Sequence, residues 1–150
     1  QLWDTSTFES INEFNGPSTT IHDMVLSPDG RHAVLCLRER SLELIDPSTG
    51  NVERVLDTRK QTVYTAAFSP DGSYLLSGSP DGVLNLWKVS SGEHLHTFTG
   101  HMSPIGVVAF SPDGRSAVSA GQFELGIKLW DLSKYVSPGS SSQSNSTALP

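Results

Sequence analysis

Few side chains in this sequence have the type and spacing that catalysis or metal binding requires. His94 and His96 lie two residues apart in a predicted strand, and side chains at that spacing point to the same face, where they could hold a metal ion. No third ligand accompanies them, so we interpret the pair as part of a solvated strand edge. Cys36, the single cysteine, lies in an apolar segment and is predicted to be a buried, unreactive thiol rather than a nucleophile.

Motifs of the common enzyme classes are also missing from the sequence. The chain contains no Gly-x-Ser-x-Gly nucleophile elbow, no phosphate-binding glycine loop and no dinucleotide-binding fingerprint. Asp29, Asp71 and Asp113 occur once per sequence repeat, so we expect them to lie far apart and to form turns. The sequence therefore predicts no catalytic, cofactor-binding or metal-binding residue, no cofactor and no enzymatic activity.

The composition excludes several classes of protein. One cysteine in 150 residues rules out a disulfide within the chain and favours a reducing compartment, the cytoplasm or alternatively the nucleus. The longest apolar run, residues 33–37, is far shorter than the roughly 20 residues of a transmembrane helix. The formal net charge of −6 and the scattered basic residues argue against nucleic acid as the default partner, because phosphate binding needs clustered Lys and Arg.

The chain repeats itself, and the repeat decides the architecture that must position these side chains. Ser-Pro-Asp-Gly occurs at residues 27–30, 69–72 and 111–114, so its starts are 42 residues apart. A second marker keeps the same register at residues 3–4, 45–46, 87–88 and 130–131, where the last spacing reflects one inserted residue near Phe123. Two markers in one register indicate three repeats at approximately 5–46, 47–88 and 89–131, together with a partial one.

Short β-branched and aromatic segments within each period predict four strands, a, b, c and d, rather than helices. We therefore expect an all-β fold in which each period is a four-stranded antiparallel meander over residues 1–136. The serine-rich, uncharged residues 137–150 are predicted to be a disordered tail. The predicted strands are residues 8–14, 21–26, 32–37, 42–46, 52–56, 63–68, 74–79, 83–89, 94–99, 105–110, 116–120 and 127–132.

These features resemble the WD-repeat family of β-propellers. The matching residues are the pair Gly100-His101, the three Ser-Pro-Asp-Gly turns, and the strand ends at residues 86–87 and 129–131. The resemblance covers roughly residues 1–133. It implies propeller blades of four-stranded meanders, with strand a lining a central channel.

The resemblance also implies a structural polar tetrad in each blade, made of a His before strand a, a Ser or Thr on strand b, an Asp in the b–c turn and the Trp of strand c. The last repeat offers the nearly complete set His101, Ser119, Glu124 and Trp130. The middle repeat offers Ser77, Asp81 and Trp87, with Arg59 in the place of the His. The first repeat has Pro17, Leu35, Glu39 and Ile45 at these positions and should lack the tetrad.

Partner binding, by the same resemblance, is expected on the face formed by the d–a and b–c connections. Tyr64 stands out there, because a tyrosine supplies a large rigid surface and one hydrogen bond. Phe123 is either an exposed hot spot or a core residue. Arg38, Arg59 and Lys60 could favour an acidic or phosphorylated partner segment. The candidate partner-binding residues are Tyr64, His22, Gln61, Ser103, Arg38 and Phe123.

The predicted function is therefore a non-catalytic scaffold that binds a partner protein or peptide, with no membrane association. The alternative is a sensor or autoinhibitory propeller domain of a larger regulatory ATPase or kinase. Three repeats cannot close a ring of the typical 4–8 blades. Since the chain also starts at Gln1 without a methionine, we expect an incomplete propeller whose remaining blades come from a longer parent chain or from self-association.

Overall fold

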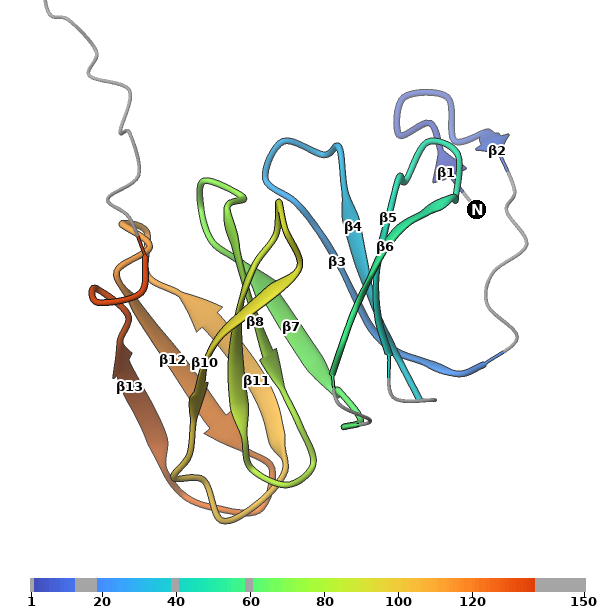
Figure 1. Cartoon of the computed structure of the whole chain (residues 1–150). Helices are drawn as coiled ribbons and strands as arrows, with labels where there is room; N and C mark the ends of the chain where they lie inside the picture. The colour runs from blue at the N-terminus through green and yellow to red at the C-terminus, as the bar shows by residue number, and fades with distance from the viewer. Residues whose placement is uncertain (1, 13–18, 39–40, 59–60, 137–150) are drawn as a thin grey trace, which may run out of the picture.

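The computed structural model describes residues 2–12, 19–38, 41–58 and 61–136, and for Leu2, Ile11 and Asn12 only the backbone. Its strands form four separate sheets, and the three larger ones stand side by side (Figure 1). No described residue is helical, and so none belongs to a helix that could cross a membrane. The strands are β1 (Leu2–Trp3), β2 (Ser10–Asn12), β3 (Ile21–Leu26), β4 (Ala33–Leu37), β5 (Ser41–Ile45), β6 (Val52–Leu56), β7 (Thr65–Phe68), β8 (Tyr74–Gly78), β9 (Leu84–Lys88), β10 (Glu93–Phe98), β11 (Ile105–Phe110), β12 (Ser116–Gly121) and β13 (Ile127–Asp131).

The sheets are antiparallel meanders, as the repeat predicts. Strands β3 to β6 form the first blade, β7 to β10 the second, and β11 to β13 the third, each pairing with its neighbours in chain order. The short β1 and β2 form a two-stranded hairpin at the c and d positions. The all-β prediction is confirmed. Residues 13, 14, 17, 39, 59 and 60 and the predicted tail at 137–150 lie outside the described residues.

Each Ser-Pro-Asp-Gly segment forms the turn between strands a and b. In the first blade the Ser27 hydroxyl donates to Asp29 Oδ1 (2.6 Å), while the Gly30 backbone N–H donates to the Ser27 carbonyl (2.9 Å). Gly30 has a φ of +70°, which a glycine adopts without steric cost. The same bonds recur at Ser69 and Ser111, so the repeated tetrapeptide is explained by turn geometry.

These turns give the chain an acid-sensitive stability. Hydrogen bonds from the hydroxyls of Ser27 and Ser111 lower the pKa of Asp29 and Asp113 from the usual value of 3.8. A carboxylate with a lowered pKa in the folded state stabilises the fold above its unfolded pKa, and this contribution is lost as the pH falls through the folded pKa. We therefore expect the free energy of unfolding to decrease below about pH 4.

Urea unfolding over a pH series will measure this dependence. The double variant Asp29→Asn and Asp113→Asn keeps similar turn side chains but removes two titrating groups. Its stability should therefore change less on acidification than that of the wild type. An equally steep acid dependence in the two proteins would show that these turns are not the cause.

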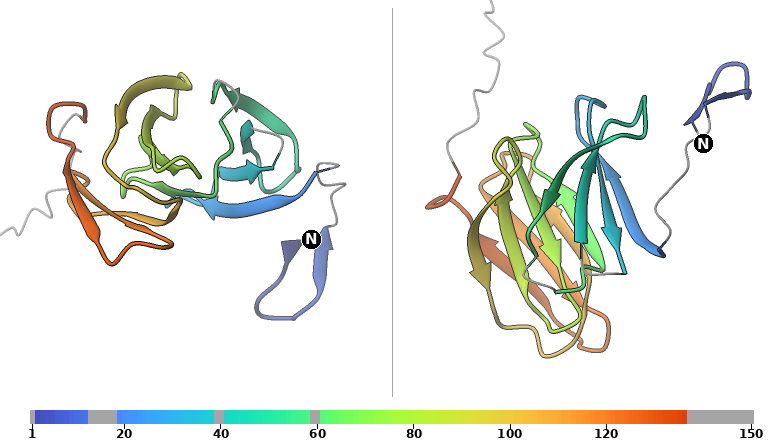
Figure 2. Two further views of the ribbon diagram at one scale, coloured as in Figure 1. Left: turned by 90° about the horizontal axis from the view of Figure 1, so that it is seen from below. Right: turned by 45° about the vertical axis from the view of Figure 1, so that its right-hand side comes forward.

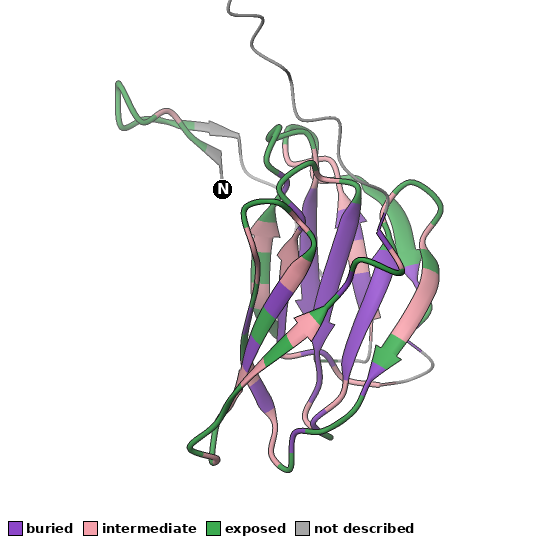
Figure 3. Cartoon of the chain, turned by 90° about the vertical axis from the view of Figure 1, so that its left-hand side faces the viewer, coloured by how far each residue is buried: buried purple, intermediate pink, exposed green. Residues whose placement is uncertain are grey.

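Two apolar cores lie between neighbouring blades, and Figure 3 shows the buried residues along the strands and the exposed ones at the turns and on parts of some strands. The core between the first and second blades contains Val34, Cys36, Leu42, Leu75 and Trp87. Burial raises the pKa of the Cys36 thiol strongly, which agrees with the prediction of an unreactive cysteine. The sheets therefore depend on one another, because each buries its apolar faces against the next.

The segment after β13 packs on the second blade instead of returning along β13. Leu132 is fully buried, and the backbone N–H groups of Tyr135 and Val136 both donate to its carbonyl. The Tyr135 ring stacks on His96 of β10 at 4.2 Å between centroids, and its hydroxyl lies 3.1 Å from His96 Nε2. Up to residue 136, therefore, no strand pairs with the outer edge of β13.

Candidate functional site

The d–a and b–c connections lie at one end of the sheets, because each strand a starts where each strand b ends. This end is at the bottom of Figure 1 and faces the viewer in the left view of Figure 2. The innermost strands of the three blades, β3, β7 and β11, lie next to one another along the stack. The hairpin of β1 and β2 stands apart from the first blade.

The structure brings the four mapped tetrad residues of the third blade together. The Trp130 indole N–H donates to Ser119 Oγ (2.8 Å), and the Ser119 hydroxyl bonds to His101 Nε2 (2.6 Å). His101 Nδ1 bonds to Glu124, whose other oxygen accepts the Met102 backbone N–H (3.0 Å). Burial, and then the charge of Lys128, lower the pKa of His101. A neutral imidazole that donates from Nδ1 and accepts at Nε2 satisfies this arrangement.

The second blade keeps only part of this arrangement in the described residues. The Trp87 indole N–H donates to Ser77 Oγ (2.8 Å), and both residues are buried. Asp81 lies in the b–c turn, as mapped, but accepts hydrogen bonds from Ser79 and from Gln61 Nε2 (3.2 Å). No hydrogen bond joins Asp81 to Ser77 or Trp87. In the first blade Leu35 is buried and Ile45 half-buried, while positions 17 and 39 are not described.

Two of the candidate partner-binding residues form an aromatic pair across neighbouring blades. The exposed His22 is the second residue of β3, the half-buried Tyr64 directly precedes β7, and their ring centroids are 4.9 Å apart. The Tyr64 backbone N–H donates to the Gly78 carbonyl (2.8 Å), which fixes the start of this segment against β8. The two rings form a partly exposed surface whose position is fixed by the backbone. This surface lies at the end of the sheets where the d–a and b–c connections are.

The other candidates divide into structural and exposed residues. Gln61 is engaged within the protein, because it bonds to Asp81 and to Asn85. The Ser103 hydroxyl accepts the Phe123 backbone N–H (3.4 Å), and the Phe123 side chain is exposed rather than part of the core. Arg38 is exposed. Sequence reasoning missed Met102 and Leu125, two highly exposed apolar residues on the same connections. Leu125 lies close to the one-residue insertion near Phe123, whereas Met102 carried no such signal.

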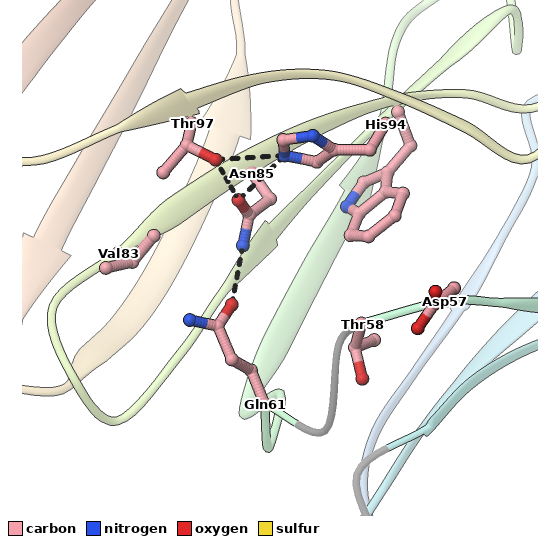
Figure 4. Close-up of a pocket in the computed structure, with 8 residues that line it drawn as sticks. Asp57, Thr58, Gln61, Val83, Asn85, His94 and Thr97 are labelled. Atoms are coloured by element: carbon pink, nitrogen blue, oxygen red, sulfur yellow. Dashed lines mark hydrogen bonds between the residues drawn. The ribbon is translucent and has the colours of Figure 1, made fainter.

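A polar cavity of about 150 Å³ lies beside Trp87 (Figure 4). The Asn85 carbonyl accepts hydrogen bonds from the Thr97 hydroxyl (2.8 Å) and from His94 Nε2 (3.0 Å), and the Asn85 amide donates to Gln61 (3.5 Å). Asp57 and Thr58 line the cavity from the connection after β6. The polar side chains that line the cavity suit the binding of water or of a small polar group.

The prediction that His94 and His96 share one face of a solvated edge is wrong. A register shift between them places His94 opposite Trp87 and His96 opposite Leu86, so the two side chains point to opposite faces. His94 bonds to Asn85, and His96 packs between Phe98 and Tyr135. Among the described residues, no three His, Cys, Asp or Glu side chains are placed to hold a metal ion.

The chain is similar to known proteins both in sequence and in structure. The family model described as "WD domain, G-beta repeat" matches residues 50–88 and 92–131. The structure is similar to the "Crystal structure of RRP9 WD40 repeats", with a TM-score of 0.73 and 25% identity, and to the "Structure of U3-55K", with 0.73 and 24%. Each alignment covers 81% of this chain and 38% of the solved chain. No curated protein matches the chain in sequence.

Proposed function

The chain belongs to the WD40 repeat family, and on this premise we propose that it is a non-catalytic scaffold that binds a partner protein or peptide at the end formed by the d–a and b–c connections. The observation that carries the proposal is the His22–Tyr64 pair, which two neighbouring blades hold at this end. Propellers of this family are commonly protein-interaction scaffolds. The single cysteine further supports a reducing compartment, the cytoplasm or the nucleus, as the place of action.

The chemistry of this end supports binding rather than turnover. Its buried polar groups are already paired: Ser77 with Trp87, and Ser119 with His101 and Trp130. Its exposed groups include the aromatic or apolar side chains of His22, Met102 and Phe123, next to polar ones such as Arg38. Aromatic and apolar side chains on a fixed backbone suit peptide recognition, because little conformational entropy is lost on binding. The open outer faces of the first and third blades are expected to pack against further blades of a longer chain or of another copy.

Replacing Tyr64 by alanine should weaken peptide binding about tenfold or more, as loss of an interface aromatic commonly does. Peptides selected from a displayed library on the wild-type protein provide the ligand, and calorimetry measures Kd. The matched control is Phe8→Ala, which removes an exposed aromatic side chain from the c–d connection at the opposite end. Selected peptides that bind the Tyr64 variant as tightly as the wild type, or that lose affinity with the Phe8 variant, would place the interaction elsewhere.

A further inference from the structure

The innermost strands of the three blades present three equivalent positions at the proposed binding end. Residues 22, 64 and 106 are 42 residues apart, so they correspond to one another in the repeat register. His22 and Tyr64 occupy the first two positions and place their rings 4.9 Å apart, with the ring planes tilted by 57°. The third position is Gly106, which has no side chain to continue this row.

The side chain of Gln122 lies where a side chain at position 106 would begin. A Cβ atom on Gly106 would be 2.8 Å from Gln122 Cγ and 3.5 Å from Gln122 Nε2, so the amide group lies over this glycine. Strand β11, which contains Gly106, is next to β7, as β7 is next to β3 (Figure 2). The three blades therefore offer an imidazole, a phenol and a carboxamide at equivalent places.

The b–c turn that carries Gln122 is fixed by contacts on both sides. The Gln122 backbone N–H donates to the Pro104 carbonyl (2.8 Å), which joins the turn to the d–a connection. Glu124, two residues further along the turn, bonds to His101 of the tetrad. The backbone of Gln122 is therefore held in position before a partner binds, which reduces the entropy that is lost on binding.

The polar groups at the tips of these three side chains are open to a partner. Among the described residues, the side chains of His22, Tyr64 and Gln122 form no hydrogen bond with another residue. His22 and Gln122 are exposed and Tyr64 is half-buried. The carboxamide and the phenol both carry hydrogen-bond donors, and none of the three residues is an acid, a lysine or an arginine. Such a row suits an uncharged segment that has free carbonyl groups and flat apolar surfaces.

We propose that the partner segment contains proline and is extended in the polyproline II conformation, with a proline ring on the His22–Tyr64 pair and a backbone carbonyl that accepts a hydrogen bond from the Gln122 amide. This conformation leaves the backbone carbonyls free, whereas a helix or a sheet uses them internally. Proline-rich segments dock on aromatic side chains. The proposal rests on the scaffold function proposed above and adds the class of its partner and Gln122 as a residue that sets specificity.

Peptides selected from a random displayed library on the wild-type chain test the class of the partner. We expect proline to be enriched over the unselected library, and the enrichment to disappear in a selection on Tyr64→Ala, because the proline ring needs the aromatic pair. Selected peptides without proline enrichment, or acidic peptides that point to the exposed Arg38, would overturn the proposal. If such peptides still bound Tyr64→Ala more weakly, the scaffold function would stand without the proline-rich partner. Failure to select any peptide would contradict both.

Calorimetry with one selected peptide tests the hydrogen bond from Gln122. Gln122→Glu keeps the length and the acceptor oxygens but loses the N–H donors, so Kd should rise about three- to tenfold, the effect of one lost hydrogen bond. Asn51→Ala is the matched control, since it removes an exposed carboxamide from the c–d connection of the first blade at the opposite end. An unchanged Kd for Gln122→Glu, or an equal rise for Asn51→Ala, would exclude this hydrogen bond.

Gly106→Ala tests the placement of Gln122 without changing it. The new Cβ atom would displace the flexible Gln122 side chain, so the melting temperature should change little while Kd rises as it does in Gln122→Ala. In the double variant the Gln122 amide is already absent, so Gly106→Ala should add no further loss of affinity to that of Gln122→Ala. Equal losses of affinity from Gly106→Ala in both backgrounds would show that Gly106 does not act through Gln122.

Discussion

Replacing Trp87 by alanine is expected to lower the free energy of unfolding by about 3–5 kcal/mol, the range for truncation of a buried large aromatic side chain. Trp87 is only 2% exposed and packs in the core between the first and second blades. The substitution would leave a cavity there, and it would also leave the buried Ser77 hydroxyl without its indole partner. Chemical denaturation followed by circular dichroism measures the loss.

Two variants separate the cavity from the hydrogen bond. Trp87→Phe keeps most of the ring but removes the indole N–H, so it should cost about 1–3 kcal/mol, the penalty for an unsatisfied buried group. Trp130→Ala should cost less than Trp87→Ala, because Trp130 is only half-buried although it makes the same bond to a serine. If Trp87→Ala were no more destabilising than Trp130→Ala, burial between the first two blades could not be the main source of stability at this position.

Replacing Gly82 by alanine should be the most damaging of the glycine substitutions in the turns. Gly82 has a φ of +77°, and a Cβ atom there would lie 2.5 Å from the His101 carbonyl oxygen and 3.2 Å from that of Ser103. Both contacts are with backbone, so a side-chain rotation cannot relieve them. The expected cost combines about 1–2 kcal/mol for the left-handed conformation with about 1–3 kcal/mol for overpacking.

Gly30→Ala is the matched control for Gly82→Ala. Gly30 has a similar φ of +70°, but a Cβ atom there would meet nothing within 4 Å, so only the conformational cost applies. Denaturant midpoints of the two variants, compared with the wild type, isolate the contact between the b–c turn of the second blade and the connection into the third. Equal losses of stability would mean that these two connections are not tightly packed.

Much of the fold follows from the sequence because the same local signals recur in register. The predicted strands at 21–26 and 105–110 coincide with β3 and β11, and the others agree within a few residues where they are described. The Ser-Pro-Asp-Gly segments predict their turns for a local reason, the bond between the serine and the aspartate. The position of β2 apart from the first blade has no such local signal.

The candidate site was less predictable, because its contacts join residues that are distant in the sequence. The repeat register correctly placed His101, Ser119, Glu124 and Trp130 within reach of one another. It could not show that Gln61 bonds to Asp81 and Asn85, since those bonds depend on side-chain lengths between a d–a connection, a b–c turn and β9. The register shift in β10 likewise places His94 and His96 on opposite faces of the strand. No residue type in β10 predicts such a shift.

The position of Cys36 makes it a natural probe for the separation of the first two sheets. The thiol is buried in the core between the first two sheets, so we expect an alkylating reagent to reach it when the sheets separate. The rate at which it is alkylated under native conditions therefore counts the separations of two neighbouring sheets, without any added label.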